Sequence, residues 1–387
     1  MAGRDPAEAH RASTPLELLF DLCFVVAVAQ AAGALHHDLA DGQVGHGVLS
    51  YLIVFFTIWW PWMNFTWFAS AYDTDDVVYR LLTFVQITGV LVVTAGIPSA
   101  FERLDFSIMV VGYVIMRIAL VAQWLRVAHE DPAGRGTTLR FALGITVVQF
   151  AWALRLGIDP AWGTVSFVAL GIVELLIPIW AERSGRPTPW HPEHIAERYG
   201  LFTIIVLGEC VLAASTAVQL AIAAGGISAA LIGVALGGLV LVFSLWWSYF
   251  KHPAEIGRVR SLGTAFAWGY GHYVVFAALA ALGAGLQVAA DATHEDVALA
   301  RDAVALTVAV PLAIYLGATA ILHARSASRR ILLPIPLVVG LVLLAGLAAP
   351  WIGVPLAIVV MGLLVAGLVT FNVATMARPA VREVDAA

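Results

Sequence analysis

Long apolar stretches constrain the fold of this chain more than any other feature of its sequence. Runs of about 20 mostly apolar residues recur from Leu16 to Phe371, and each is long enough to cross a bilayer as a helix. Charged residues make up 12% of the chain, whereas soluble domains contain about 25%. We therefore predict an all-α integral membrane protein and exclude a water-soluble fold.

Twelve transmembrane helices are predicted from these runs, and the intervening turns are rich in Gly, Pro and Asp. The first run contains Glu17 and Asp21 and lacks a clear cleavage motif, so we interpret it as a retained helix rather than a cleaved signal peptide. The predicted spans are roughly 16–35, 47–70, 78–100, 106–125, 139–157, 162–182, 199–221, 227–250, 261–289, 303–323, 331–349 and 352–372.

The basic residues support this number of spans and orient the chain. Of the 21 Lys and Arg residues, 17 fall at the termini or in loops on one side of the membrane, while Arg103, Arg155 and Arg301 fall on the other and Arg117 lies inside a span. Because basic residues favour the cytoplasmic side, we expect a multi-pass protein of the cell (plasma) membrane with both termini cytoplasmic. The 17 residues are Arg4, Arg11, Arg80, Arg126, Arg135, Arg140, Arg183, Arg186, Arg198, Lys251, Arg258, Arg260, Arg325, Arg329, Arg330, Arg378 and Arg382.

Three pairs of landmarks recur at nearly the same separation and predict an internal duplication. We predict two six-helix halves, residues 1–187 and 188–387, in parallel orientation because six is an even number of crossings. Such halves are related by an axis along the membrane normal. Chance similarity between apolar helices is the alternative. The pairs, 180 to 187 residues apart, are Trp59-Trp60 with Trp246-Trp247, Glu17 with Glu197, and Gln86 with His272.

Several polar residues are predicted to lie near the bilayer midplane. At about 1.5 Å per residue, Glu209 lies about 16 Å beyond Arg198, and the other ionisable groups lie about 13–18 Å from the basic end of their helices. Such residues usually face a bundle interior or a wet cavity. We interpret the set as a transport site in which Arg117 pairs with Glu174 or Glu209, and a free carboxylate binds a cation or a proton. The alternative is a contact that only fixes helix packing. The set is Glu209, Arg117, Glu174, His272, Gln86 and Asn64.

One face of the third predicted helix is polar. At 100° per residue its polar positions align and predict either a lined pathway or hydrogen bonding between helices. The aligned residues are Asp76, Tyr79, Arg80, Thr83, Gln86 and Thr94.

Two polar clusters are expected at cytoplasmic helix ends: 72-YDTDD-76 and 191-HPEHIAER-198. The aromatic residues of 59-WWPWMNFTWF-68, just before the first cluster, are expected at the membrane interface. Either cluster has residue types that ligate metals. Neither matches a specific motif, so a solvated loop or helix cap is favoured and no metal or other cofactor is expected.

Glu17 and Asp21 lie one turn apart on one face of the first predicted helix, where like charges repel. A nearby arginine, a cation or a retained proton should compensate them. Together with the two clusters they form a predicted cytoplasmic entrance. Its residues are Glu17, Asp21, Asp73, Asp76, Arg80, His191, His194, Glu197 and Arg198.

Three blocks of sequence resemble a known family. The blocks 16-LELLFDLCFVVAVAQ-30, 59-WWPWMNFTWFASAYDTDDVVYRLL-82 and 190-WHPEHIAERYGLFTIIVLGE-209 are similar, in order and spacing, to signature blocks of the bacterial low temperature requirement A (LtrA) family. The resemblance covers nearly the whole chain. It implies a polytopic membrane protein linked to growth at low temperature, and it implies no particular biochemical activity.

A second resemblance is more limited. Phe20-Asp21, and a second helix with Trp and Asn, are similar to the six-helix-repeat potassium and proton-leak channels of endolysosomes and bacteria. Those channels carry Phe-Ser-Asp on the first helix. Here no Ser intervenes, and the second half has Leu201-Phe202 without Asp, so channel activity is not implied.

Three functions are compatible with these observations. We favour an ion or small-solute transporter or channel that supports growth at low temperature, a bacterial stress response. The first alternative is a membrane-embedded metal-dependent enzyme or lipid-binding protein acting at the cytoplasmic face; the second is a structural or sensory membrane protein without catalysis. The expected partners are membrane lipids and an ion or small solute, and no nucleic acid is expected. The sequence leaves open whether the chain forms a homo-oligomer.

Overall fold

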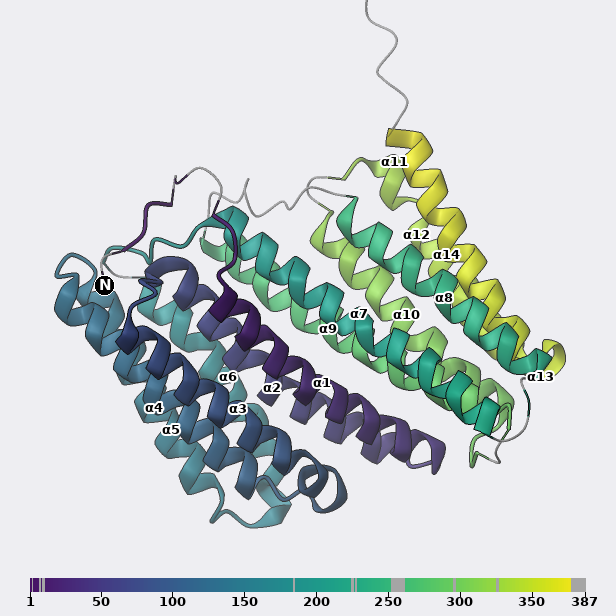
Figure 1. Cartoon of the computed structure of the whole chain (residues 1–387), viewed down its shortest axis with the longest axis horizontal. Coiled ribbons are helices and arrows are strands. Elements are labelled where there is room, and N and C mark those ends of the chain that lie inside the picture. The colour runs from purple at the N-terminus through teal and green to yellow at the C-terminus, as the bar shows by residue number, and fades with distance from the viewer. Residues whose placement is uncertain are drawn as a thin grey trace, which may run out of the picture. The chain divides into compact units, whose positions relative to one another are not determined.

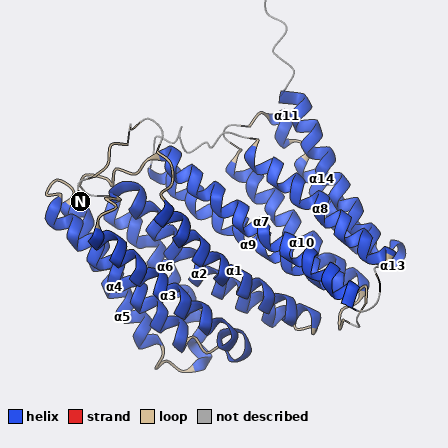
Figure 2. Ribbon diagram, viewed as in Figure 1, coloured by secondary structure: helices blue, strands red, loops and turns tan. Residues whose placement is uncertain are grey.

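The computed structural model describes residues 1, 3–6, 8, 11–183, 185–223, 226, 228–251, 262–294, 297–324 and 327–376 (Figure 1). Throughout this part of the chain the regular structure is helical, without strands (Figure 2). The prediction of an all-α protein is therefore confirmed. Five basic residues used above to orient the chain lie outside the described residues: Arg258, Arg260, Arg325, Arg378 and Arg382.

Twelve helical segments among the described residues are long and apolar enough to cross a membrane, as predicted. The helices are α1 (Pro15–Ala40), α2 (Val44–Tyr72), α3 (Val77–Arg103), α4 (Ser107–Glu130), α5 (Arg135–Arg155), α6 (Gly163–Glu182), α7 (Pro192–Ala223), α8 (Ala229–Phe250), α9 (Leu262–Asp291), α10 (Arg301–Leu322), α11 (Arg329–Leu332), α12 (Ile335–Leu347), α13 (Ala349–Ile352) and α14 (Val354–Met376), with a short 3-10 helix at Pro160–Trp162.

Most helix bounds lie within about five residues of the predicted spans, and two larger differences have a physical reason. The seventh helix begins at Pro192 rather than near residue 199, so two polar turns precede its apolar run. The predicted span 331–349 is divided into α11 and α12 near Pro334, because proline lacks the N–H that continues a helix. Pro61 and Pro178 lie inside α2 and α6, which is tolerated where neighbouring groups satisfy the freed carbonyls.

The chain forms two compact units that differ from the predicted halves. The first comprises Met1–Ala31, Ser50–Phe202 and Ile256–Phe266, and the second comprises Ala32–Leu49, Thr203–Glu255 and Ala267–Ala387. Several helices, α1 and α7 among them, therefore contribute residues to both units.

In the first unit, α3 packs on α4, α4 on α5, and α5 on α6. The backbones of α3 and α4 approach each other closely at Gly89 and Gly112. A Cβ atom at Gly112 would lie 2.6 Å from the carbonyl oxygen of Gly89 and 2.6 Å from the amide nitrogen of Val93. Small residues of this kind let transmembrane helices approach closely.

The tryptophans of α2 line the core of this unit. Trp59, Trp60 and Trp62 have exposed fractions of 1%, 0% and 0%, so they face the interior of the unit, and their expected depth at the membrane interface stays a prediction. The physical reason is that buried carboxylates of other helices accept hydrogen bonds from two of these indoles. Trp60 donates to Glu174, and Trp62 donates to Asp21.

In the second unit, α8 packs on α14, α10 on α12, and α12 on α14. The order α10–α12–α14 parallels α4–α5–α6 in the first unit. The landmark tryptophans, however, differ in environment: Trp246 and Trp247 are about half exposed, whereas Trp59 and Trp60 are buried. The parallel duplication therefore stays a prediction.

Candidate functional site

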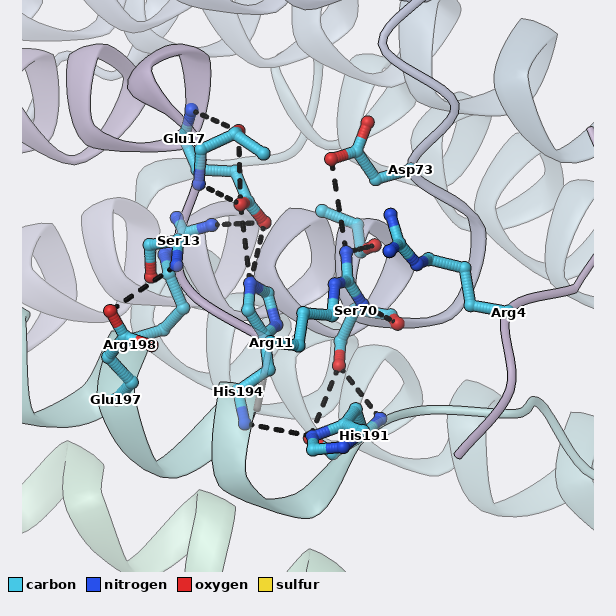
Figure 3. Close-up of polar contacts among 12 residues, drawn as sticks. Arg4, Arg11, Ser13, Glu17, Ser70, Asp73, His191, His194, Glu197 and Arg198 are labelled. Carbon is cyan, nitrogen blue, oxygen red and sulfur yellow. Dashed lines mark hydrogen bonds and ion pairs between the residues drawn. The ribbon is translucent and has the colours of Figure 1, made fainter. Parts of the chain in front are cut away.

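The parts of α1 and α7 that belong to the first unit bring four ionisable side chains together. Glu17 and Asp21 lie one turn apart in α1, and His194 and Arg198 lie one turn apart in α7. All four are 0% exposed. We call these four residues the buried charge network, and Figure 3 shows Glu17, His194 and Arg198 with the polar residues around them.

Arg198 contacts both carboxylates of the network. Its Nη1 atom lies 2.9 Å from Oε1 of Glu17, and its Nη2 and Nε atoms donate to the two oxygens of Asp21 at 2.6 and 3.0 Å. This two-point contact uses the planar fork of the guanidinium. The Trp62 indole also donates to Asp21, at 2.7 Å. The arginine expected beside Glu17 and Asp21 is thereby found, and its single charge faces two carboxylates.

Glu17 is also held by the start of its own helix. Its Oε2 accepts from the backbone N–H and the hydroxyl of Thr14, at 2.8 and 3.1 Å, and the Thr14 hydroxyl accepts from the Glu17 N–H at 3.3 Å. This reciprocal pair is a capping box. The carboxylate further contacts Nε2 of His194 at 3.2 Å. A single carboxylate thus joins a helix cap, an imidazole and a guanidinium.

His191 caps α7 and positions the network. Its Nδ1 accepts from the His194 N–H at 3.3 Å, and its Nε2 contacts the Glu8 carbonyl oxygen at 2.8 Å. A ring that accepts at Nδ1 and donates at Nε2 is neutral, and we assign that tautomer from these partners. The His191 N–H donates to Ser70 at 3.0 Å, which ties the start of α7 to the end of α2.

Arg11 and Asp73 extend the polar region beside the network (Figure 3). Arg11 donates to the carbonyls of Ala69 and Ser70, the last turn of α2, and its Nη2 lies 3.9 Å from Asp73. Burial raises the pKa of Asp73 to about 6, and the negative charge of Glu17 acts in the same direction.

The remaining carboxylates of 72-YDTDD-76 each have an arginine. Asp75 pairs with Arg80 at 2.7 Å. Asp76 caps α3 by accepting from the Tyr79 N–H at 2.9 Å. It also accepts two hydrogen bonds from Arg126, at 2.8 and 2.6 Å, and these hold its pKa well below its usual range. The helix-cap interpretation is confirmed for Asp76.

Of the two forms expected at residues 191–198, the helix cap is present, because α7 begins at Pro192 and is capped by His191, and the solvated loop is not. His191, His194 and Arg198 are 4%, 0% and 0% exposed, and all but His191 lie within α7. The segment looks solvated in sequence because its partners, Glu8, Glu17 and Asp21, lie 177 or more residues away. Glu197 is partly buried, and its carboxylate accepts a hydrogen bond from the Ser13 N–H at 3.3 Å. Across the described part of the chain, no three His, Cys, Asp or Glu side chains are grouped so as to hold a metal ion.

The predicted partner of Arg117 is resolved in favour of Glu174. Both side chains are 1% exposed and lie 3.4 Å apart in the first unit. The indoles of Trp60 and Trp152 donate to the Glu174 carboxylate at 2.7 and 3.1 Å, and Arg117 also donates to the Tyr113 hydroxyl at 3.0 Å. The carboxylate is thus shared by three donors from α2, α4 and α5.

Glu209 and His272 belong to the second unit, so the convergence of all four midplane groups stays a prediction. His272 is buried; its Nδ1 contacts the Trp268 carbonyl oxygen at 2.8 Å and its Nε2 contacts the Tyr249 hydroxyl at 3.1 Å. Glu209 is half-buried in α7, where Gly283 of α9 approaches its Cβ atom. Among the described residues its carboxylate makes neither a hydrogen bond nor an ion pair.

Gln86 and Asn64 make local contacts in the first unit. Gln86 donates to Gln123 of α4 at 2.8 Å, and Gln123 in turn lies 3.4 Å from the Thr83 hydroxyl. Hydrogen bonding between helices therefore accounts for these positions of the polar face of α3. The Asn64 side-chain amide donates to the Trp60 carbonyl at 2.7 Å.

The sequence analysis did not predict that tryptophan side chains donate hydrogen bonds to the buried carboxylates. Trp60, Trp62 and Trp152 hold the carboxylates of Glu174 and Asp21. A local signal existed for Trp60 and Trp62, because they lie on either side of Pro61 near the middle of a long apolar helix rather than at its end. No local signal existed for Trp152.

Comparison with known proteins agrees with the resemblance noted above. A family model described as bacterial low temperature requirement A protein matches residues 12–369. An uncharacterized protein of Rhizobium meliloti (strain 1021) is 29% identical over 217 residues, which cover 54% of this chain and 52% of the relative. The chain thus spans about half the length of the curated relative that it matches.

Proposed function

The chain belongs to the bacterial low temperature requirement A family and is a multi-pass membrane protein, and on this premise we propose that it is an ion or small-solute transporter or channel. The buried charge network is the site where it binds a proton or a small cation. The low-temperature role implied by the family is part of the proposal.

One observation carries this proposal, the unequal number of charges in the network. Glu17 and Asp21 supply two carboxylates against the one guanidinium of Arg198. The neighbouring Arg11 is matched by Asp73, and all five side chains are buried. An uncompensated charge inside a protein costs several kcal/mol or more. A proton on His194, 3.2 Å from Glu17, would neutralise the network. A bound monovalent cation would do the same.

His194 has the properties of an exchangeable proton carrier. Histidine is the side chain whose ordinary pKa lies closest to physiological pH. The Nδ1 atom of His194 is buried and lacks a hydrogen-bond partner among the described residues. A water molecule can therefore hydrogen-bond to this atom, or a proton can bind to it. His191, by contrast, has both ring nitrogens occupied by protein groups. Ionisable groups inside membrane helices commonly mark such pathways.

The metal-dependent enzyme is less well supported. Its carboxylates would be Asp73, Asp75 and Asp76, and each of these faces an arginine of the chain. A divalent ion would have to displace those guanidinium groups.

Flux measurements in proteoliposomes test the proposal. Protein reconstituted in liposomes is assayed for proton, K⁺ and Na⁺ flux with ion-sensitive dyes. We expect Glu17→Gln to reduce flux at least tenfold, because the substitution removes one of the two carboxylate charges. Glu193→Gln, which removes an exposed carboxylate in the first turn of α7, next to His194, is the matched control and should retain flux.

Two further results separate the alternatives. Loss of flux in Glu209→Gln with retention in Glu17→Gln would move the site to the second unit. Absence of flux for all three ions in wild-type protein that is monodisperse and thermally stable would contradict ion transport. Gel filtration and thermal unfolding of each variant distinguish lost transport from lost fold.

A further inference from the structure

A cavity in the first unit is walled by aromatic side chains and contains one carboxylate. The cavity is open on one side, and the space of about 500 Å³ at this place includes solvent outside its mouth. Trp67 comes from α2, Trp124 from α4, Phe141 from α5, and Trp190 from the segment just before α7. The carboxylate is that of Glu182, the last residue of α6.

The aromatic rings of the wall are fixed by contacts with one another. Trp67 and Trp190 pack edge to face, with ring centroids 4.9 Å apart. Trp124 and Phe141 are stacked, with centroids 4.3 Å apart and planes 3° from parallel. The Trp67 indole also donates to the Tyr199 hydroxyl at 3.1 Å. A preformed wall of this kind needs little ordering when a ligand enters.

Glu182 has no basic side chain as its partner. The side chain is 6% exposed, and its two oxygens accept from the N–H and the hydroxyl of Thr188, at 3.1 and 2.5 Å. None of the ion pairs found among the described residues includes Glu182. Arg140, the nearby cation of α5, donates to the Ala181 carbonyl oxygen at 3.1 Å. Among the described residues, no cationic side chain competes with a ligand for the Glu182 carboxylate.

Aromatic faces and a lone carboxylate select for one class of ligand. Ring faces carry negative potential and attract cations, and cages of aromatic residues bind quaternary ammonium groups. Metal cations such as Na⁺, K⁺ or Ca²⁺ need several oxygen ligands, which this mostly apolar wall does not supply. Anions are disfavoured by Glu182. An alkylammonium group matches both the apolar wall and the charge.

We propose that this cavity binds a small organic cation of the alkylammonium class through the aromatic rings of its wall, Trp67, Trp124 and Trp190, and the carboxylate of Glu182. Asn64, which was predicted from sequence as part of a polar site, lines the same cavity. The proposal does not depend on the transport proposal above, because its residues are separate from the buried charge network. The same headgroup can come from a free amine or from a choline lipid.

Binding of choline to the purified protein tests this inference. Detergent-solubilised full-length protein is titrated with choline and, separately, with 3,3-dimethylbutan-1-ol, its uncharged analogue of the same shape. Tryptophan fluorescence and calorimetry report binding. We expect saturable choline binding at least tenfold tighter than binding of the uncharged alcohol. Equal binding of the two would overturn the proposal, and this comparison needs no variant.

Variants locate the site. Glu182→Gln should weaken choline binding at least tenfold, and Trp190→Leu should weaken it and reduce the fluorescence change. Trp351→Phe is the control for fluorescence, because Trp351 is 83% exposed and lies in the second unit. Choline binding that is unchanged in both Glu182→Gln and Trp190→Leu would exclude this cavity.

The source of the cation is decided by a third comparison. Protein in nanodiscs of phosphatidylcholine or of phosphatidylglycerol is titrated with choline. If a lipid headgroup occupies the cavity, phosphatidylcholine should weaken the apparent choline affinity, whereas equal affinity in both lipids identifies a free amine. Retained choline binding in Glu17→Gln separates this site from the transport site.

Discussion

At the scale of residues, the pairing of Arg198 with Glu17 and Asp21 explains how two like charges one turn apart stay buried. Carboxylates at that helical spacing repel each other. Because the two carboxylates are close together, one guanidinium from another helix contacts both, at 2.9 and 2.6 Å, and offsets their repulsion. Removing one member of such a buried group typically costs about 3–5 kcal/mol, because the others lose their compensation.

Asp73 provides a pH-dependent prediction. Its pKa is raised from 3.8 to about 6 by burial. The folded protein therefore binds more protons at this site than the unfolded chain does between those values, and the contribution of Asp73 to stability falls as pH rises through that window. Asp73→Asn cannot ionise. The free energy of unfolding of this variant, relative to that of wild type, should therefore rise by about 1 kcal/mol between pH 5 and pH 7.

Thermal unfolding in one detergent at pH 5, 6 and 7 measures this difference. Asp75→Asn is the control: Arg80 lowers the pKa of the exposed Asp75, so that group stays ionised across the range and the difference from wild type should be flat. A Tm difference between Asp73→Asn and wild type that stays constant, or falls with pH, would contradict the raised pKa.

At the scale of elements, the helices were predictable wherever the apolar run reached the helix end. The bounds of α2 to α6 lie within a few residues of the predicted spans. The beginning of α7 was not predictable from apolar character, because its first two turns contain His194, Glu197 and Arg198. Polar residues of that kind are normally solvated; here they are held inside by α1, which is a tertiary contact.

The α3–α4 contact gives a prediction for an element pair. Gly112→Ala would place a Cβ atom 2.6 Å from backbone atoms of α3, closer than real Cβ contacts allow. Overpacking of this kind costs about 1–3 kcal/mol, and more when backbone must move. We expect the variant to unfold at a Tm several degrees lower in detergent.

Gly367→Ala is the matched control for that substitution. Gly367 lies in α14, is exposed, and would have no neighbour within 4 Å of an added Cβ atom. Its Tm should stay equal or rise slightly, because alanine favours helix over glycine. A Gly112→Ala protein as stable as Gly367→Ala would show that α3 and α4 separate without loss.

At the scale of the whole molecule, the twelve candidate spans among the described residues predict that both chain ends lie on the same side of the membrane. The excess of Arg and Lys in the loops of that side predicts that it is the cytoplasmic side. Fusions test this arrangement. Alkaline phosphatase inserted at Gly42, between α1 and α2, should be active outside the cytoplasm, and the same fusion at Gly134, between α4 and α5, should be inactive.

A reporter that fluoresces only in the cytoplasm, inserted at the same two positions, gives the reciprocal signal. Phosphatase activity at both positions would mean that a span between them is missing from the membrane. Activity at Gly134 alone would reverse the orientation and remove the cytoplasmic assignment of the buried charge network.

The number, length and approximate bounds of the helices followed from sequence alone. A bilayer requires about 20 apolar residues per crossing and leaves the backbone no partner except its own helix. The proximity of Glu17 and Asp21 could also be predicted from the sequence, because residues four apart in a helix lie on the same face. Only the tertiary structure decided that Arg198, 177 residues away, lies between them, or that Trp60 and Trp152 hold Glu174. Such contacts depend on how each helix is rotated and crossed against its neighbours, which the apolar pattern of one helix does not specify.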